Sequence, residues 1–169
     1  FEVWLEDWQV VEVADRLYRL QVTAPAAGTE NADQTAVIRL ELDLMDLKGP
    51  ILQGDQGYSR KGADAGNASY YYSLTRLQTT GKLELNGETF DLHGNSWMDH
   101  EYSTSALSAN QVGWDWFSIQ LDNNQELMLF QLRNADGSVD GFSTAALIQG
   151  DGSVTRFTPS EFTIKSLAT

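Results

Sequence analysis

The sequence contains no cysteine, which excludes disulfide bonds, thiolate catalysis and zinc sites with cysteine ligands. Basic residues are also scarce: 11 Lys and Arg stand against 24 Asp and Glu, giving a formal net charge of -13. Nucleic acid and anionic bilayers repel such a chain, so neither is an expected partner. No apolar run approaches the roughly 18 residues that a membrane-spanning helix needs, so we expect no transmembrane segment.

Apolar residues make up 41% of the sequence, enough for a packed core, and they recur with a period of two. Between Ile38 and Leu44 every second residue is apolar, the pattern of a half-buried strand. Asn86-Gly87 is a typical two-residue hairpin turn between two further strands. Similar segments cover residues 116–121, 126–132, 143–148 and 154–157. Many short antiparallel strands predict an all-β protein, either an up-and-down barrel or a sandwich.

Two loops and the two ends stand out from this pattern. Ala24 to Asp33 is an ordinary loop of small residues, whereas Gly49 to Ser69 is long and glycine-rich, as functional loops often are. Helix is expected at most as one short turn, at Asp15 to Leu20 or at Ser160 to Phe162. Because both ends of the chain are strand-like, we expect it to be part of a longer protein.

The densest group of polar side chains lies between Gly94 and Tyr102. Asp99, His100 and Glu101 are adjacent, and strand alternation predicts that the two acids share one face while the imidazole lies on the other. A carboxylate beside a histidine can fix the histidine tautomer, which suits an acid/base site at a strand end. Alternatively, these residues form hydrogen bonds that hold two strands together.

A second candidate is Asp115, which lies between Trp114 and Trp116. In a regular strand the two tryptophans share one face, and Asp115 lies in the apolar row that continues with Phe117. Burial in such a row favours the protonated carboxyl, so Asp115 is a candidate proton donor. Alternatively, Asp115 lies in solvent at the start of the strand or bonds to a turn.

The remaining candidates depend on residue type alone. The run from Tyr70 to Tyr72 provides either a ligand-binding wall with hydroxyl groups or an ordinary strand. Gly94-Asn95-Ser96 resembles the start of a nucleophile elbow with Ser96 as the nucleophile, but the motif is incomplete because Met98 stands where it requires the closing glycine. The two histidines, at positions 93 and 100, match no metal-binding motif, so neither a metal nor another cofactor is expected.

Four motifs in order resemble one bacterial family, the AttH-like proteins related to carotenoid hydratase (hydroxyneurosporene synthase) and also labelled secreted hydrolases. The motifs are LQGDQGYSRKG at 52–62, GNASYYYSLTR at 66–76, SWMDHE at 96–101 and GWDWF at 113–117. The resemblance implies two successive lipocalin-like antiparallel β-barrels. It assigns residues 1–149 to the later part of the first barrel, and residues 150–169 to its end or to the beginning of the second.

The resemblance also implies a function. It indicates a bacterial protein, periplasmic or secreted, that binds a hydrophobic isoprenoid or lipid-like small molecule and hydrates an alkene with the help of an acid, or catalyses a hydrolysis. The implied catalytic residues are Asp115, or Asp99 acting through His100. The implied ligand-binding residues are Trp97, Trp114 and Trp116, which would stabilise a cation, and Tyr70 or Tyr72, which would orient water. The alternative is a non-catalytic periplasmic carrier that accompanies an ABC transport system.

Overall fold

The computed structural model describes residues 1–25, 37–103, 107–165 and 167. These residues form twelve strands and no helix, and every strand pair with a defined register is antiparallel, so the all-β antiparallel prediction is confirmed. Among them there is accordingly no helix of the length and apolarity that crossing a membrane requires. The loop expected from Ala24 to Asp33 lies mostly outside the described residues.

The chain forms two compact units, each assembled from two separate stretches of sequence. The first unit contains residues 1–49 and 76–96, and the second contains residues 50–75 and 97–169. Two long strands, β7 (Ala68–Leu85) and β8 (Glu88–Ser103), contribute residues to both units. The division expected at residues 149 and 150, between the first barrel and the segment that follows, stays a prediction.

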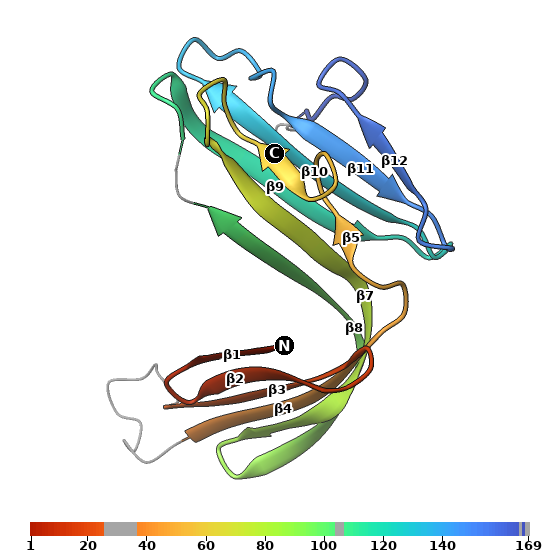
Figure 1. The fold of residues 1–169 in the computed structure, drawn as a ribbon. Helices are drawn as coiled ribbons and strands as arrows, with labels where there is room; N and C mark the ends of the chain where they lie inside the picture. The colour runs from red at the N-terminus through yellow and green to blue at the C-terminus, as the bar shows by residue number, and fades with distance from the viewer. Residues whose placement is uncertain (26–36, 104–106, 166, 168–169) are drawn as a thin grey trace. The chain divides into compact units, whose positions relative to one another are not determined.

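The first unit is a single antiparallel sheet. Its strands β1 (Glu2–Leu5), β2 (Trp8–Ala14), β3 (Leu17–Pro25) and β4 (Val37–Asp46) are neighbours in chain order, followed by the C-terminal part of β7 and the N-terminal part of β8 (Figure 1). The hairpin between β7 and β8 turns through Asn86 and Gly87, both with positive φ, as the sequence predicted. The short helical turn considered near Asp15 is wrong, because that residue begins a tight turn into β3.

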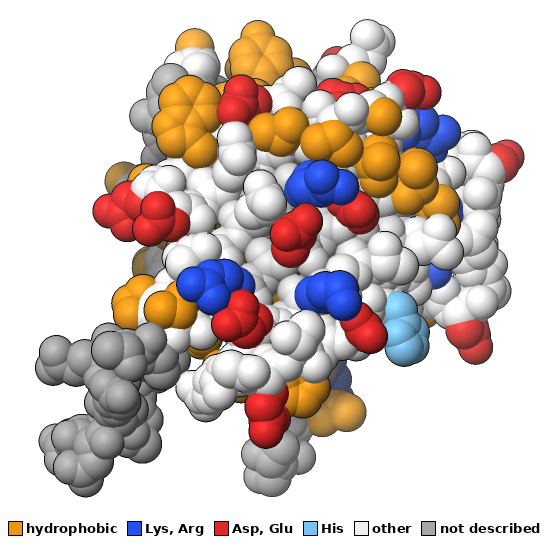
Figure 2. Space-filling view, turned by 90° about the horizontal axis from the view of Figure 1, so that it is seen from below, with side chains coloured by type: hydrophobic (Ala, Val, Ile, Leu, Met, Phe, Trp, Pro, Cys, Tyr) orange, Lys and Arg blue, Asp and Glu red, His pale blue; other side chains and the backbone are white. Residues whose placement is uncertain are grey.

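Strand alternation gives this sheet one apolar and one charged face. The register places Leu20 opposite Leu42, and Leu42 opposite Gly81, on the apolar face. The charged face carries three ion pairs between neighbouring strands, and Figure 2 shows acidic and basic side chains lying next to one another in this way. These pairs are Arg19–Asp43, Arg39–Glu84 and Lys82–Asp91.

The second unit has two layers of strands. In one layer β5 (Ile51–Leu52) and β6 (Tyr58–Arg60) pair with the N-terminal part of β7, which also pairs with β8. These two short strands lie in the segment from Gly49 to Ser69 that was expected to be a loop. The other layer is a four-stranded sheet of β9 (Gln111–Gln120), β10 (Glu126–Asn134), β11 (Thr144–Ile148) and β12 (Val154–Phe157) (Figure 1).

The core of the second unit joins these two layers. Tyr71 on β7 packs against Met128, Phe130 and Leu132 on β10, with Trp97 at the margin of the cluster. The alternating apolar residues of β10 explain this contact, because every second side chain of the strand faces β7. A pocket opens beside this cluster. At the end of the chain, residues 160–162 form no helix, so that short helical turn is also wrong.

Candidate functional site

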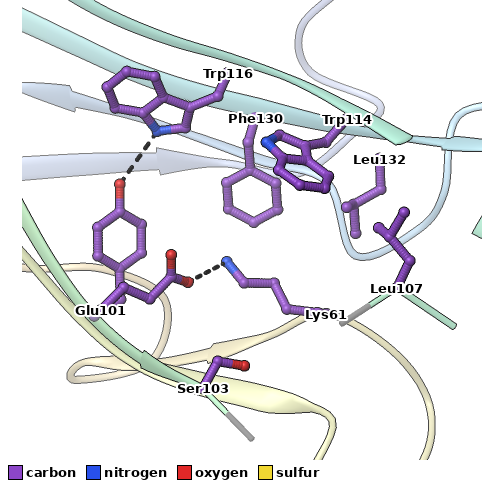
Figure 3. Close-up of a pocket in the computed structure, with 9 residues that line it drawn as sticks. Lys61, Glu101, Ser103, Leu107, Trp114, Trp116, Phe130 and Leu132 are labelled. Atoms are coloured by element: carbon purple, nitrogen blue, oxygen red, sulfur yellow. Dashed lines mark hydrogen bonds and ion pairs between the residues drawn. The ribbon is translucent and has the colours of Figure 1, made fainter. Parts of the chain in front are cut away.

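The pocket in the second unit has a volume of about 240 Å³ and mostly apolar and aromatic walls (Figure 3). Trp114 and Trp116 come from one face of β9, and Phe130 comes from β10, the neighbouring strand of the same sheet. Nine side chains line it: Lys61, Tyr71, Glu101, Ser103, Leu107, Trp114, Trp116, Phe130 and Leu132. Its volume lies just below the usual range of pockets for drug-sized ligands, so it suits a small apolar molecule or the end of a longer one.

One ion pair lies inside this apolar pocket. The ammonium group of Lys61 is 3.0 Å from Oε1 of Glu101 and donates a hydrogen bond of 3.1 Å to Oγ of Ser59. It also lies 4.1 Å from the centre of the Phe130 ring, and Figure 3 shows it pointing between that ring and Glu101. Burial lowers the pKa of Lys61, and the Glu101 carboxylate offsets this effect only in part.

A directed chain of hydrogen bonds runs from the pocket wall to Asp99. Nε1 of Trp116 donates to Oη of Tyr71 (3.3 Å), and the Tyr71 hydroxyl donates to Oδ1 of Asp99 (3.0 Å). From the other side, Nε2 of Gln53 donates to Oγ of Ser73 (3.0 Å), which donates to the same Oδ1 (2.5 Å). Burial, and next the nearby Asp99 carboxylate, raise the pKa of Tyr71, so its phenol stays protonated at neutral pH.

The structure brings together four of the residues predicted for the site. Trp114 and Trp116 line the pocket, Asp99 bonds to Tyr71 in its wall, and Trp97 packs against the core cluster beside it. The indole nitrogen of Trp97 is buried and has no hydrogen-bond partner among the described residues. Asp99 itself is not one of the residues that line the pocket.

His100, Tyr70 and Tyr72 lie on the opposite faces of β8 and β7. The Tyr72 ring stacks on the His100 ring, with 5.3 Å between the ring centres, and Tyr70 makes an edge contact with Tyr58. Tyr70 is 67% exposed. Strand alternation explains this arrangement, because the residue between the two tyrosines, Tyr71, is the one that faces the pocket. Asp99 therefore bonds to Tyr71 rather than to His100.

Asp115 also faces away from the pocket. Its carboxylate lies 3.3 Å from Nε of Arg133, on the face of β9 opposite to Trp114 and Trp116. The absence of a side chain at Gly113 makes room for Arg133, since a Cβ atom there would lie 2.8 Å from its Nη2. Asp115 is thus the partner of an arginine on the face of β9 that it shares with Phe117, away from the pocket, and its side chain is 41% exposed rather than buried.

Sequence reasoning missed Lys61, Tyr71 and Phe130 as pocket residues. The alternation of Asp99 and Glu101 on one face was predicted and is confirmed by their contacts with β7 and Lys61. The same alternation would have selected Tyr71 once Asp99 was assigned to that face. No signal in the sequence identified Lys61, because it lies in the long segment before β7. The described residues contain no group of three or more His, Asp or Glu side chains that could hold a metal ion.

Comparisons with known proteins agree with one another. The family model described as AttH-like matches residues 1–169. A crystal structure from Nitrosomonas europaea, provisionally described as AttH, is 38% identical with a TM-score of 0.79; the match covers 94% of this chain and 46% of that one. The chain thus spans about half the length of this relative. No curated protein gave a significant match.

A second solved structure, kievitone hydratase from Nectria haematococca, is 10% identical with a TM-score of 0.55. The match covers 88% of this chain and 57% of the hydratase. At this identity the likeness shows the fold alone. Together with the antiparallel all-β structure, the comparisons confirm the lipocalin-like fold class that the sequence motifs implied.

Proposed function

Because the chain belongs to the AttH-like family, we propose that its pocket binds an apolar small molecule of the isoprenoid or lipid-like class. The observation that carries this proposal is the composition of the pocket, in which two tryptophans and a phenylalanine surround one neutralised ion pair. Aromatic walls with few polar groups are typical of sites for apolar ligands. Binding of such a ligand is favourable because it removes the apolar surface of these rings from water.

Two neighbouring residues of β9 provide a matched test of this proposal. Trp116 is 40% exposed and faces the pocket, and Phe117 is 39% exposed and faces away from it. Binding is measured with the neutral fluorophore N-phenyl-1-naphthylamine and its displacement by geraniol. We expect Trp116→Ala to weaken both interactions about tenfold or more, since losing a contacting aromatic ring costs over 1 kcal/mol. Phe117→Ala should change them less than about twofold. Equal effects of the two substitutions, or no binding by the unaltered protein, would refute the proposal.

The same site supports acid-assisted hydration of an alkene. Oδ1 of Asp99 accepts two hydroxyl hydrogen bonds, and its Oδ2 has no hydrogen bond within the described residues, so Oδ2 is the atom that can carry a proton. A ligand that extends past the Tyr71 hydroxyl would receive this proton on one alkene carbon. The rings of the pocket would stabilise the resulting cation. Water would then add to the cationic carbon and return a proton to Asp99.

Substitutions of two aspartates distinguish this reaction from ligand binding alone. Asp99→Asn should abolish the hydrated product while retaining ligand binding, and Asp115→Asn should retain both, because Asp115 pairs with Arg133 outside the pocket. The reaction is followed by mass spectrometry of the products formed from alkenes that displace the fluorophore. Turnover by Asp99→Asn at the rate of the unaltered protein would refute the assignment.

A second candidate is the non-catalytic carrier, which we place in the bacterial periplasm or outside the cell, with an ABC transport system as its partner. The observation that favours it is that Asp99 lies behind Tyr71 rather than in the pocket lining. A carrier needs the apolar walls but no acid. It would bind geraniol and lose binding in Trp116→Ala, yet hydrate no alkene that it binds. Any hydrated product that depends on Asp99 would refute this candidate.

A further inference from the structure

Lys61 differs from Lys82, another lysine with an identified acidic partner, in its surroundings. Its side chain is 18% exposed, whereas that of Lys82, which also has an acidic partner, is 67% exposed. Its ammonium group is held between Glu101, Ser59 and the Phe130 ring, at the wall of the apolar pocket. No step of the proposed hydration uses this group, although a buried amine is costly to retain without a role.

We propose that Lys61 forms a reversible imine with an aldehyde group on an apolar ligand in this pocket. The proposal rests on the proposed function, because the same walls hold the carbon skeleton, and it specifies a carbonyl group at the end of the ligand. A lysine in an apolar pocket is suited to this chemistry because burial favours the neutral amine, which is the nucleophile. Its lowered pKa agrees with this.

The reaction balances with Glu101 as the group that moves the proton. Glu101 takes one proton from the Lys61 ammonium, and the nitrogen lone pair attacks the carbonyl carbon while the C–O π electrons move to oxygen. The oxygen gains that proton and a second proton from nitrogen, and it leaves as water. The product is a protonated imine, so one ammonium and one aldehyde become one iminium and one water with no change in charge.

The contacts of Lys61 suit the product as well as the free amine. A protonated imine retains its positive charge, so the Glu101 carboxylate remains its counter-ion at the position now 3.0 Å from Nζ. The Phe130 ring, 4.1 Å from the same atom, stabilises an iminium as it does an ammonium. The carbon bonded to nitrogen then continues into the space lined by Trp114 and Leu132.

Citral and geraniol test this proposal, because they share one isoprenoid skeleton and differ in the aldehyde and alcohol groups. The protein is treated with limiting citral and sodium cyanoborohydride at neutral pH, and the modified lysines are identified by peptide mass mapping. The hydride reduces the imine, and the protein gains the mass of citral less one oxygen atom. We expect the adduct on Lys61 at least ten times more often than on Lys82, and we expect excess geraniol to suppress it at Lys61 only.

The controls separate this proposal from the one on which it rests. Equal modification of Lys61 and Lys82, or modification of Lys61 that geraniol does not suppress, would overturn the imine proposal. If citral and geraniol both displace N-phenyl-1-naphthylamine but no adduct forms on Lys61, the imine proposal fails and the binding proposal stands. If neither displaces it, the binding proposal fails. Lys61→Arg should lose the adduct.

Discussion

Two carboxylates with the same exposure provide a direct test of how burial of a cation changes the stability cost of removing its counter-ion. Glu101 pairs with Lys61 in the second unit, and Glu84 pairs with Arg39 in the first. Both carboxylate side chains are 38% exposed, and both nitrogen–oxygen distances are 3.0 Å. The cations differ, since Lys61 is 18% exposed and Arg39 is 56% exposed. Glu101→Gln and Glu84→Gln therefore compare the loss of a counter-ion from a buried and from an exposed cation.

The expected costs follow from these exposures. Losing one partner of an exposed pair costs about 0.2–1 kcal/mol, and losing one partner of a fully buried pair costs about 3–5 kcal/mol. Because Lys61 is mostly buried but Glu101 remains accessible to water, we expect Glu101→Gln to lower the free energy of unfolding by about 1–3 kcal/mol. Glu84→Gln should lower it by less than about 1 kcal/mol. Urea unfolding, with hydrogen exchange measured separately in each unit, gives both values.

The pH dependence makes this prediction sharper. Burial lowers the pKa of Lys61 in the folded protein, and Glu101→Gln removes the carboxylate that opposes this shift. The unfolded chain then binds the proton more tightly than the folded chain, so stability rises with pH up to the ordinary lysine pKa of 10.5. The loss in unfolding free energy caused by Glu101→Gln, which we call its deficit, should shrink as the pH rises from about 7 to about 10. The deficit of Glu84→Gln should stay constant because arginine remains protonated. Equal deficits at neutral pH, or a deficit that does not change with pH, would refute the reasoning.

Three further predictions concern the strands that support the site. Gly81→Ala should destabilise the first unit by about 1–3 kcal/mol in urea unfolding, because its Cβ would lie 2.0 Å from the carbonyl oxygen of Glu41. Gly94→Ala is the control and should be nearly neutral, because a Cβ at that position meets no atom within 4 Å. Met128→Ala should cost about 2–5 kcal/mol in the same assay, since this side chain is fully buried in the core under the pocket. In an ultraviolet titration to about pH 11, the folded Tyr71→Phe variant should lose one tyrosine that stays protonated in the folded unaltered protein, because the pKa of Tyr71 is raised above the ordinary value of 10.0.

The period-two pattern predicted several strands and the Asn86-Gly87 hairpin, but it did not predict the short strands β5 and β6, and it could not assign every face. Three consecutive tyrosines do not show which of them faces the core, because a shift of one residue moves each side chain to the other face of the sheet. The sequence pattern therefore gives no reason to prefer Tyr70 and Tyr72 over Tyr71 as residues that face a ligand. Asp99 and Glu101 were easier, because two acids separated by one residue must share a face.

Residues outside regular alternation were harder to predict from the sequence. Lys61 lies between the short strand β6 and the long strand β7, and only the fold brings it to Glu101, which is distant in sequence. Asp115 fits a buried acid by pattern alone, but the β9–β10 register aligns it with Gln131, next to Arg133. Whether a carboxylate on a strand forms an ion pair thus depends on residues of the neighbouring strand. The sequence pattern of its own strand gives no information about those residues.

The two acids of β8 face a complementary series of hydroxyl groups on β7, and this arrangement links the two proposals while keeping them separable. Ser73 and Tyr71 donate to Asp99, and Ser69 donates to Glu101. The Asp99 branch continues to Trp116, whereas the Glu101 branch continues through Lys61 to Ser59. Because no hydrogen bond among the described residues joins the two branches, Asp99→Asn should abolish hydration and leave the citral adduct on Lys61 intact. Loss of that adduct in Asp99→Asn would show that the site acts as one network.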